Sequence, residues 1–124
     1  MREVTRLAVL ESGEPAVRVL AAVGDLDRTD QIAVTAVLVH AETTRPWYAR
    51  EADEVLAVDG LDLADLTAAL TGAGIDTVWP GHWGTATPVE LTEACEAVGL
   101  SVVGPGSASL RALEESGGKS PAYL

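Results

Sequence analysis

The sequence has too few cations for a nucleic-acid-binding protein. Its 124 residues contain 8 Lys and Arg against 19 Asp and Glu, which gives a formal net charge of −11. Phosphate backbones are bound by clustered Lys and Arg side chains with release of counterions. The cations here are scattered, and the net field repels polyanions and anionic lipid surfaces alike. We therefore expect neither nucleic acids nor membrane surfaces as partners.

Cysteine and long apolar runs are also scarce. Cys95 is the single cysteine, so no disulfide can form within the chain, which fits a reducing compartment. Only four apolar residues, 7–10, stand between Arg6 and Glu11. Such a run is too short for the core of a signal peptide or for a membrane span. These features predict a cytoplasmic protein.

Aromatic residues number only five, three Trp and two Tyr, with no Phe. A core must therefore be built from Ala, Val and Leu, which is typical of helices that pack closely on a parallel sheet. Apolar residues make up 48% of the sequence, which is too many for a disordered chain. The length and composition indicate one compact domain.

Short β-branched runs alternate with longer segments of helical periodicity. The runs predict strands at residues 6–10, 32–40, 54–58, 77–80 and 101–104, and the periodic segments predict helices at 15–23, 63–73, 88–98 and 108–115. Residues 26–30 are predicted as a polar loop. Strands and helices that alternate at this spacing form βαβ units. We therefore predict an α/β fold, a three-layer Rossmann-like parallel sheet of about five strands with helices on both faces.

Ligands of open parallel sheets bind beyond the carboxyl ends of the strands. Three predicted loops emerge there, at residues 11–14, 81–84 and 105–107. The first loop occupies the place of a dinucleotide-binding glycine motif, but it has one glycine and two carboxylates, Glu11 and Glu14. These carboxylates would oppose a pyrophosphate at the following helix, so a tight turn is the better interpretation.

The second loop has the most unusual local composition in the chain. Gly81 and Gly84 bracket a titratable imidazole, His82, and a large indole, Trp83. His82 could transfer a proton or hydrogen-bond a ligand, and Trp83 could form a ligand wall. The alternative for both residues is a surface or interface contact.

Metal and phosphate motifs are incomplete. His40, His82 and Cys95 lack the spacing of metal ligands, and Cys95 falls in the apolar stripe of a helix, where a buried, inert thiol is usual. We therefore predict no metal site. Lys119 follows Gly117-Gly118, as at the end of a P-loop, but the preceding glycine of that motif and the following helix are missing. Lys119 could still reach a phosphate that another domain holds.

Six short motifs, in order along the chain, carry a family resemblance. They are Gly13-Glu14-Pro15-Ala16, Ala52-Asp53-Glu54, Pro80-Gly81, Glu93-Ala94-Cys95-Glu96, Val103-Gly104-Pro105 and Gly117-Gly118-Lys119. In this order and spacing the sequence resembles the N-terminal, pre-ATP-grasp domain of biotin carboxylases, most of all those of multidomain acyl-CoA carboxylases.

The resemblance implies a domain at residues 1–115, followed at 116–124 by the start of a linker to an ATP-grasp domain. The parent enzyme would bind ATP, Mg and biotin, and it would use ATP and bicarbonate to carboxylate the biotin. This domain would not be catalytic alone. It implies that Lys119 approaches ATP and that Gly81, His82, Trp83 and Gly84 face the active site. The implied partners are the ATP-grasp domain, a biotin carrier domain and a second copy of the chain.

Three other interpretations remain. One is the pre-ATP-grasp domain of another ligase, such as the large chain of carbamoyl-phosphate synthase. The second is a free-standing interaction module without catalysis. The third and weakest is a small, receiver-like nucleotide-binding domain, because Glu11 and Glu14 lack the downstream Asp and Lys that such domains use at their strand ends.

Overall fold

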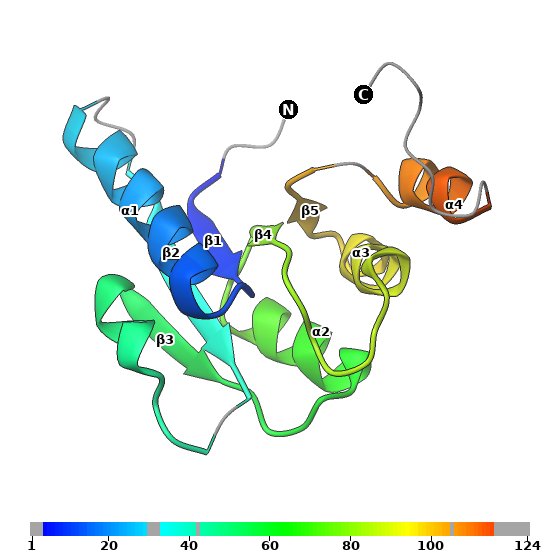
Figure 1. Ribbon diagram of the computed structural model, residues 1–124, viewed down its shortest axis with the longest axis horizontal. Coiled ribbons are helices and arrows are strands. Elements are labelled where there is room, and N and C mark those ends of the chain that lie inside the picture. Colours follow the sequence, from blue (N-terminus) through cyan, green and yellow to red (C-terminus); the bar gives the residue numbers. More distant parts are fainter. Residues whose placement is uncertain (1–3, 30–32, 42, 105, 116–124) are drawn as a thin grey trace.

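The computed structural model describes residues 4–29, 33–41, 43–104 and 106–115 (Figure 1). Within them, one parallel sheet has the strand order β3-β2-β1-β4-β5. The strands are β1 (Arg6–Val9), β2 (Thr35–His40), β3 (Glu54–Ala57), β4 (Thr77–Trp79) and β5 (Ser101–Val102). The helices are α1 (Gly13–Thr29), the 3-10 helix η1 (Trp47–Glu51), α2 (Leu63–Gly72), α3 (Pro88–Ala97) and α4 (Ser107–Glu115). The predicted α/β class and parallel sheet are confirmed.

The strand order decides which face each helix covers. The chain moves from β1 to β3 toward one edge of the sheet, and then returns past β1 to β4 and β5. Because crossovers between parallel strands are right-handed, the connections in the two directions lie on opposite faces. α1 and η1 therefore cover one face, whereas α2 and α3 cover the other, and α4 packs on α3 (Figure 1).

The core consists of small and branched side chains on both faces of the sheet. On one face, Leu66 and Leu70 of α2 and Cys95 of α3 pack with Ala8 and Val78. On the other face, Leu20 and Val23 of α1 pack with Leu7 and Val9 of β1. The core built from Ala, Val and Leu is thus confirmed, with Trp83 and Tyr48 as its two large aromatic residues.

One local prediction was wrong, and one short helix was missed. The polar stretch that was predicted as a loop is helical as far as Thr29, because α1 continues well beyond the predicted end at residue 23. Polar residues are compatible with a helix, and the stretch contains no proline to stop it. The short helix η1 was not predicted at all, since five residues are too few to show a helical period.

The start of α3 has a strong local signal. Thr87 accepts a hydrogen bond from the Glu90 amide at 3.1 Å, and the Glu90 carboxylate accepts one from the Thr87 amide at 2.8 Å. This reciprocal pair is a capping box, and Pro88 fills the first helical position, where no amide hydrogen is needed. The helix therefore begins at the residue that its sequence specifies.

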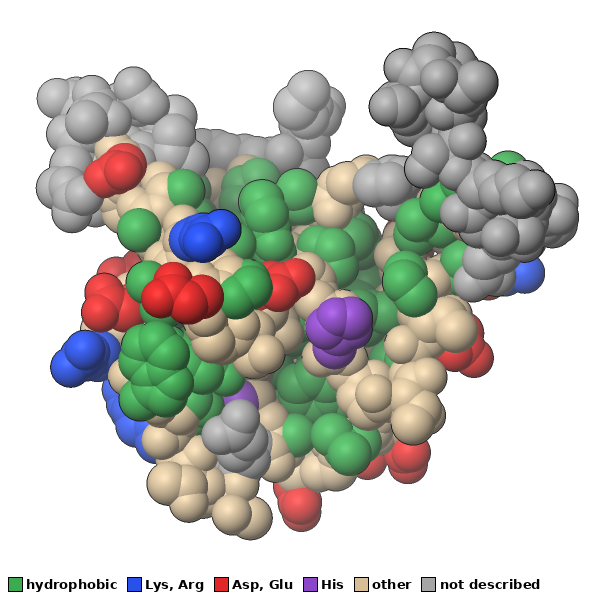
Figure 2. All heavy atoms as spheres, viewed as in Figure 1, with side chains coloured by type: hydrophobic (Ala, Val, Ile, Leu, Met, Phe, Trp, Pro, Cys, Tyr) green, Lys and Arg blue, Asp and Glu red, His purple; other side chains and the backbone are tan. Residues whose placement is uncertain are grey.

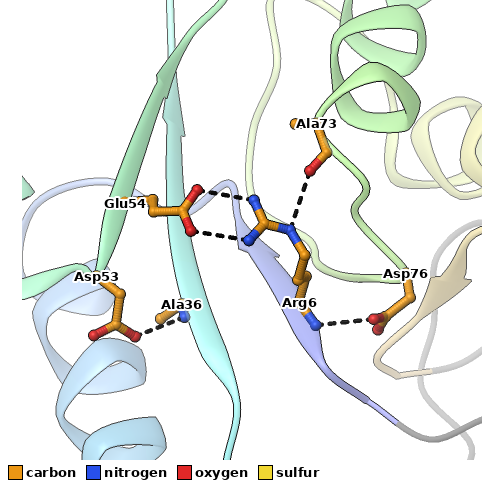
Figure 3. A network of polar contacts seen from close by, with 6 residues as sticks. All are labelled: Arg6, Ala36, Asp53, Glu54, Ala73 and Asp76. Atoms are coloured by element: carbon orange, nitrogen blue, oxygen red, sulfur yellow. Dashed lines mark hydrogen bonds and ion pairs between the residues drawn. The ribbon is translucent and has the colours of Figure 1, made fainter.

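A polar network ties together the amino edge of the sheet (Figure 3). Arg6 forms two hydrogen bonds with the Glu54 carboxylate, both at 2.9 Å, and its Nε donates to the Ala73 carbonyl at 3.1 Å. Asp53 accepts a hydrogen bond from the Ala36 amide at 2.9 Å. The Ala52-Asp53-Glu54 motif therefore has a structural role, at the edge opposite to the predicted ligand site.

Asp76 belongs to the same network and accepts more hydrogen bonds than its neighbours there. Its carboxylate accepts from the Arg6 amide at 2.8 Å, from the Thr5 hydroxyl at 2.5 Å and from the Thr77 hydroxyl at 2.8 Å. Desolvation raises the pKa of Asp76, but these hydrogen bonds outweigh it, so the pKa lies below its ordinary value. The charged form of Asp76 thus stabilises the fold.

We expect Asp76→Asn to lower the free energy of unfolding at pH 7 by about 1–2 kcal/mol, since an amide cannot accept all these hydrogen bonds and the site is partly solvated. The folded-state pKa is depressed, so the contribution of Asp76 is complete above its unfolded pKa of about 3.9. It is lost as the pH falls through the lower folded-state pKa. Urea unfolding at pH 7 and near pH 2 measures this difference.

Asp62→Asn is the matched control, because Asp62 is exposed at the start of α2 and makes no side-chain capping hydrogen bond. Its expected effect is below about 0.5 kcal/mol. An Asp76→Asn effect that is equal at both pH values would contradict the assignment of the stabilisation to the charged carboxylate.

Candidate functional site

A cavity of about 130 Å³ lies at the carboxyl edge of the sheet. It is lined by residues 10–12 after β1, 39–41 at the end of β2, 82–84 after β4, and by Tyr48 and Leu61. The three central strands end side by side at this edge, so their loops converge although they are far apart in the sequence. The predicted loops after β1 and β4 thus meet in one site.

Of the third predicted loop, Gly106 and Ser107 do not line this cavity, and Pro105 lies outside the described residues. The Ser107 hydroxyl, at the start of α4, donates a hydrogen bond to the Glu96 carboxylate of α3 at 2.7 Å. Arg111 of α4 also pairs with Glu93 of α3. These two contacts attach α4, which follows β5, to α3. The end of β2 and the position of Tyr48, which the sequence analysis did not assign to the site, complete the cavity instead.

The loop after β4 is held in place by close backbone packing. A Cβ atom at Gly81 would lie 2.7 Å from both the carbonyl carbon and oxygen of Leu10, and 2.8 Å from the Glu11 nitrogen. No side chain fits there, so the loop lies directly on the end of β1. At Gly84 the backbone has a φ of +55°, which favours glycine. The two glycines therefore fix the path of the loop.

His82 and Trp83 are adjacent in the sequence but differ in environment. The His82 side chain is exposed at the cavity, whereas Trp83 is only 4% exposed and belongs to the core between the sheet and α2 and α3. The alternative that Trp83 makes a surface contact is therefore wrong, because its side chain is buried. Figure 2 shows a histidine side chain at the surface, among hydrophobic side chains.

Two residues that line the cavity each carry an enclosed polar atom without a hydrogen-bond partner among the described residues, Nδ1 of His40 and Nε1 of Trp83. His40 is 8% exposed at the end of β2. An unpaired buried polar group costs about 1–3 kcal/mol, and most such groups in native proteins are paired. Both atoms are enclosed and thus lie behind the cavity surface rather than on it.

The charge at the cavity does not favour phosphate. Glu11 lines it, and among the described residues around it there is no Lys or Arg. Lys119, predicted to approach a phosphate, lies outside the described residues. Within the part of the chain that the structure describes, no three His, Cys, Asp or Glu side chains are placed to hold a metal ion.

The thiol of Cys95 lies in the core and does not line the cavity. It is fully buried in α3, and this burial, together with the nearby Glu96 carboxylate, raises its pKa to about 11. A reactive thiol needs a lowered pKa and access to solvent. The prediction that Cys95 is buried is confirmed.

Among the described helices, none is long and apolar enough to span a membrane.

Comparisons with known proteins agree with this architecture. Residues 3–110 match the family model described as the biotin carboxylase N-terminal domain. The biotin carboxylase domain of a single-chain bacterial carboxylase is 29% identical over 86% of this chain, with a TM-score of 0.68. A single-chain, multidomain long-chain acyl-CoA carboxylase is 25% identical over 90% of the chain, with a TM-score of 0.73. A comparison with curated proteins gives no match.

The fold alone is shared more widely. The pyruvate carboxylase of Rhizobium etli is 22% identical over 91% of this chain, with a TM-score of 0.75. The chain spans 25% of the bacterial biotin carboxylase domain and 11% of each of the two multidomain carboxylases. The family match extends over all five strands and both faces of the sheet. On this evidence the chain belongs to the family of biotin carboxylase N-terminal domains.

Proposed function

We propose that this chain serves as the N-terminal domain of a biotin-dependent carboxylase. It contributes one wall of an active site in which ATP and bicarbonate are used to carboxylate biotin, and it has no catalytic activity alone. The observation that carries the proposal is the family match over residues 3–110. That match also favours a biotin carboxylase over a carbamoyl-phosphate synthase.

The described residues around the cavity are not a phosphate-binding set. The cavity walls offer a carboxylate and imidazoles but no cation for phosphate, and the described residues offer no ligand set for Mg. ATP and Mg would therefore be held mainly by an ATP-grasp domain, with Lys119 as the contribution of this chain. The exposed His82, on a loop fixed by Gly81 and Gly84, would face that domain.

The proposed partners are the ATP-grasp domain, a biotin carrier domain and a second copy of the chain. The bacterial biotin carboxylase domain, of which this chain spans 25%, provides a partner for the experiment. A version of that domain without its own N-terminal quarter is expressed with this chain. We expect the two polypeptides to copurify and to restore ADP release that depends on biotin and bicarbonate.

Each polypeptide alone is the control, and we expect no biotin-dependent ADP release from the 124-residue chain. Turnover by this chain alone would show that it is catalytic, against the proposal. Circular dichroism shows whether the truncated partner is folded. If it is folded but neither binds this chain nor gains activity, the assignment of this chain as an active-site wall is wrong.

A further inference from the structure

The helix α4 adds no side chain to the hydrophobic core. Every residue of α4 whose side chain the structure describes, 107–113, is exposed or only partly buried. None of them belongs to a core cluster or to the partly buried apolar residues that pack against one. Figure 1 shows α4 beside α3, at the outside of the molecule. Burial of apolar surface therefore holds α4 less firmly than it holds α1, α2 or α3, which all contribute to the core.

Two carboxylates of α3 hold α4 instead. The hydroxyl of Ser107, the first residue of α4, donates a hydrogen bond of 2.7 Å to Glu96, and Arg111 one turn later pairs with Glu93. Glu93 and Glu96 are three residues apart, so they lie on the same side of α3. The side chains of Arg111 and Glu93 are 54% and 46% exposed. Ion pairs as exposed as this one are weak and are screened by salt.

By itself, α4 lacks the features that stabilise a helix in water. It has nine residues, whereas isolated helices shorter than about 12–15 residues are marginal. Its first turn has no acidic residue and its last turn has no basic one. The sequence places Glu114 and Glu115 at its end, where negative charge opposes the helix dipole. The favourable negative charge at its start comes from Glu96 of α3. We therefore expect α4 to unwind once its contacts with α3 are lost.

The rest of the domain does not need α4. The five strands pair with one another, and β5 ends before α4 begins. Glu93 and Glu96 are readily hydrated when α4 leaves, whereas Leu91 and Cys95 of α3 belong to the core. In the connection to α4, Gly104 has a φ of +113°, and a Cβ atom there would meet nothing within 4 Å. The connection can therefore move without disturbing packed side chains.

We infer that α4 is a conformational switch that is sensitive to ionic strength. It docks on α3 through Glu93 and Glu96, and it undocks and unwinds while the sheet and the other α-helices stay folded. No residue of α4 lines the cavity at the carboxyl edge, so the switch leaves that cavity in place. The inference concerns this chain alone and does not depend on the proposed function.

Native-state hydrogen exchange of the ¹⁵N-labelled 124-residue chain, followed by NMR, tests the switch. At about 0.01 M NaCl we expect the amides of Leu110 and Leu113 to be protected about tenfold to a hundredfold, because α4 opens locally. The amides of Leu70 in α2 and Cys95 in α3 should be protected at least about a hundredfold more strongly. At about 1 M NaCl, where the Debye length is about 3 Å, protection of α4 should fall about threefold relative to Leu70.

Three substitutions test the two carboxylates. Glu93→Gln and Glu96→Gln keep the side-chain shape and remove the charge, and we expect each to lower the protection of α4 about threefold and the pair to lower it about tenfold. Glu14→Gln is the matched control, because it removes the same charge from α1 on the opposite face of the sheet. It should change the protection of α4 by less than about twofold. Circular dichroism and the amide signals of the strands show whether each variant is folded.

Four results would overturn the inference. The first is protection of α4 equal to that of Cys95, since α4 would then open only with the whole domain. The second is a complete lack of protection at low salt, which would mean that α4 does not dock. The third is protection of α4 that does not fall in 1 M NaCl, a concentration of about 3 Å Debye length. The fourth is an effect of Glu14→Gln as large as those of Glu93→Gln and Glu96→Gln, which would assign the effect to net charge.

Discussion

Trp83→Ala is expected to lower the free energy of unfolding by about 3–5 kcal/mol, a large part of the 5–15 kcal/mol that stabilises a typical domain. Trp83 is 4% exposed and packs in the core with residues of the sheet, α2 and α3. Its truncation removes apolar contacts and leaves a cavity, since the surrounding backbone cannot fully collapse. Urea unfolding monitored by circular dichroism measures the loss.

Trp47→Ala is the matched control for this substitution. Trp47 is 61% exposed, and its ring makes an edge contact with that of Tyr48 at a centroid distance of 5.3 Å. We expect a loss of at most about 1 kcal/mol. Trp83→Phe is a second comparison, and it should cost less than half as much as Trp83→Ala because the indole Nε1 has no partner to lose. Equal effects of Trp83→Ala and Trp47→Ala would show that the loop after β4 is not part of the core.

Gly81→Ala is the second substitution with a large expected effect. The new Cβ would lie within 2.8 Å of three backbone atoms of Leu10 and Glu11, and backbone at the end of a central strand cannot move aside cheaply. We expect a loss of about 2–3 kcal/mol in the free energy of unfolding. The loop after β4 should also move away from β1, with changed amide signals at Glu11, Ser12 and Trp83.

Gly72→Ala tests whether this effect comes from close packing rather than from the loss of a glycine as such. A Cβ at Gly72 would meet nothing within 4 Å, and this glycine lies at the end of α2 without a positive φ. We expect a stability between unchanged and about 1 kcal/mol higher, because Ala favours the helix more than Gly. A Gly81→Ala variant as stable as the wild type would contradict the close contact between the two loops.

Local sequence signals predicted most of the fold because they depend on neighbouring residues. Short β-branched runs predicted the strands, and the helical period that includes Leu66 and Leu70 predicted α2. The resemblance to biotin carboxylase N-terminal domains came from short motifs in order along the chain, and the family match confirms it. The failures were equally local in origin, since a run of polar residues after residue 25 does not by itself distinguish a loop from a helix.

The sequence by itself determined the order and class of the elements, a parallel α/β sheet of low aromatic content and high negative charge. Only the tertiary structure decided that Trp83 is buried while His82 beside it is exposed, because a loop has no period that assigns faces. It also decided that His40 shares a cavity with them, and that Arg6 pairs with Glu54, 48 residues away. Such contacts depend on strand order, which arises when the whole chain packs its apolar faces together.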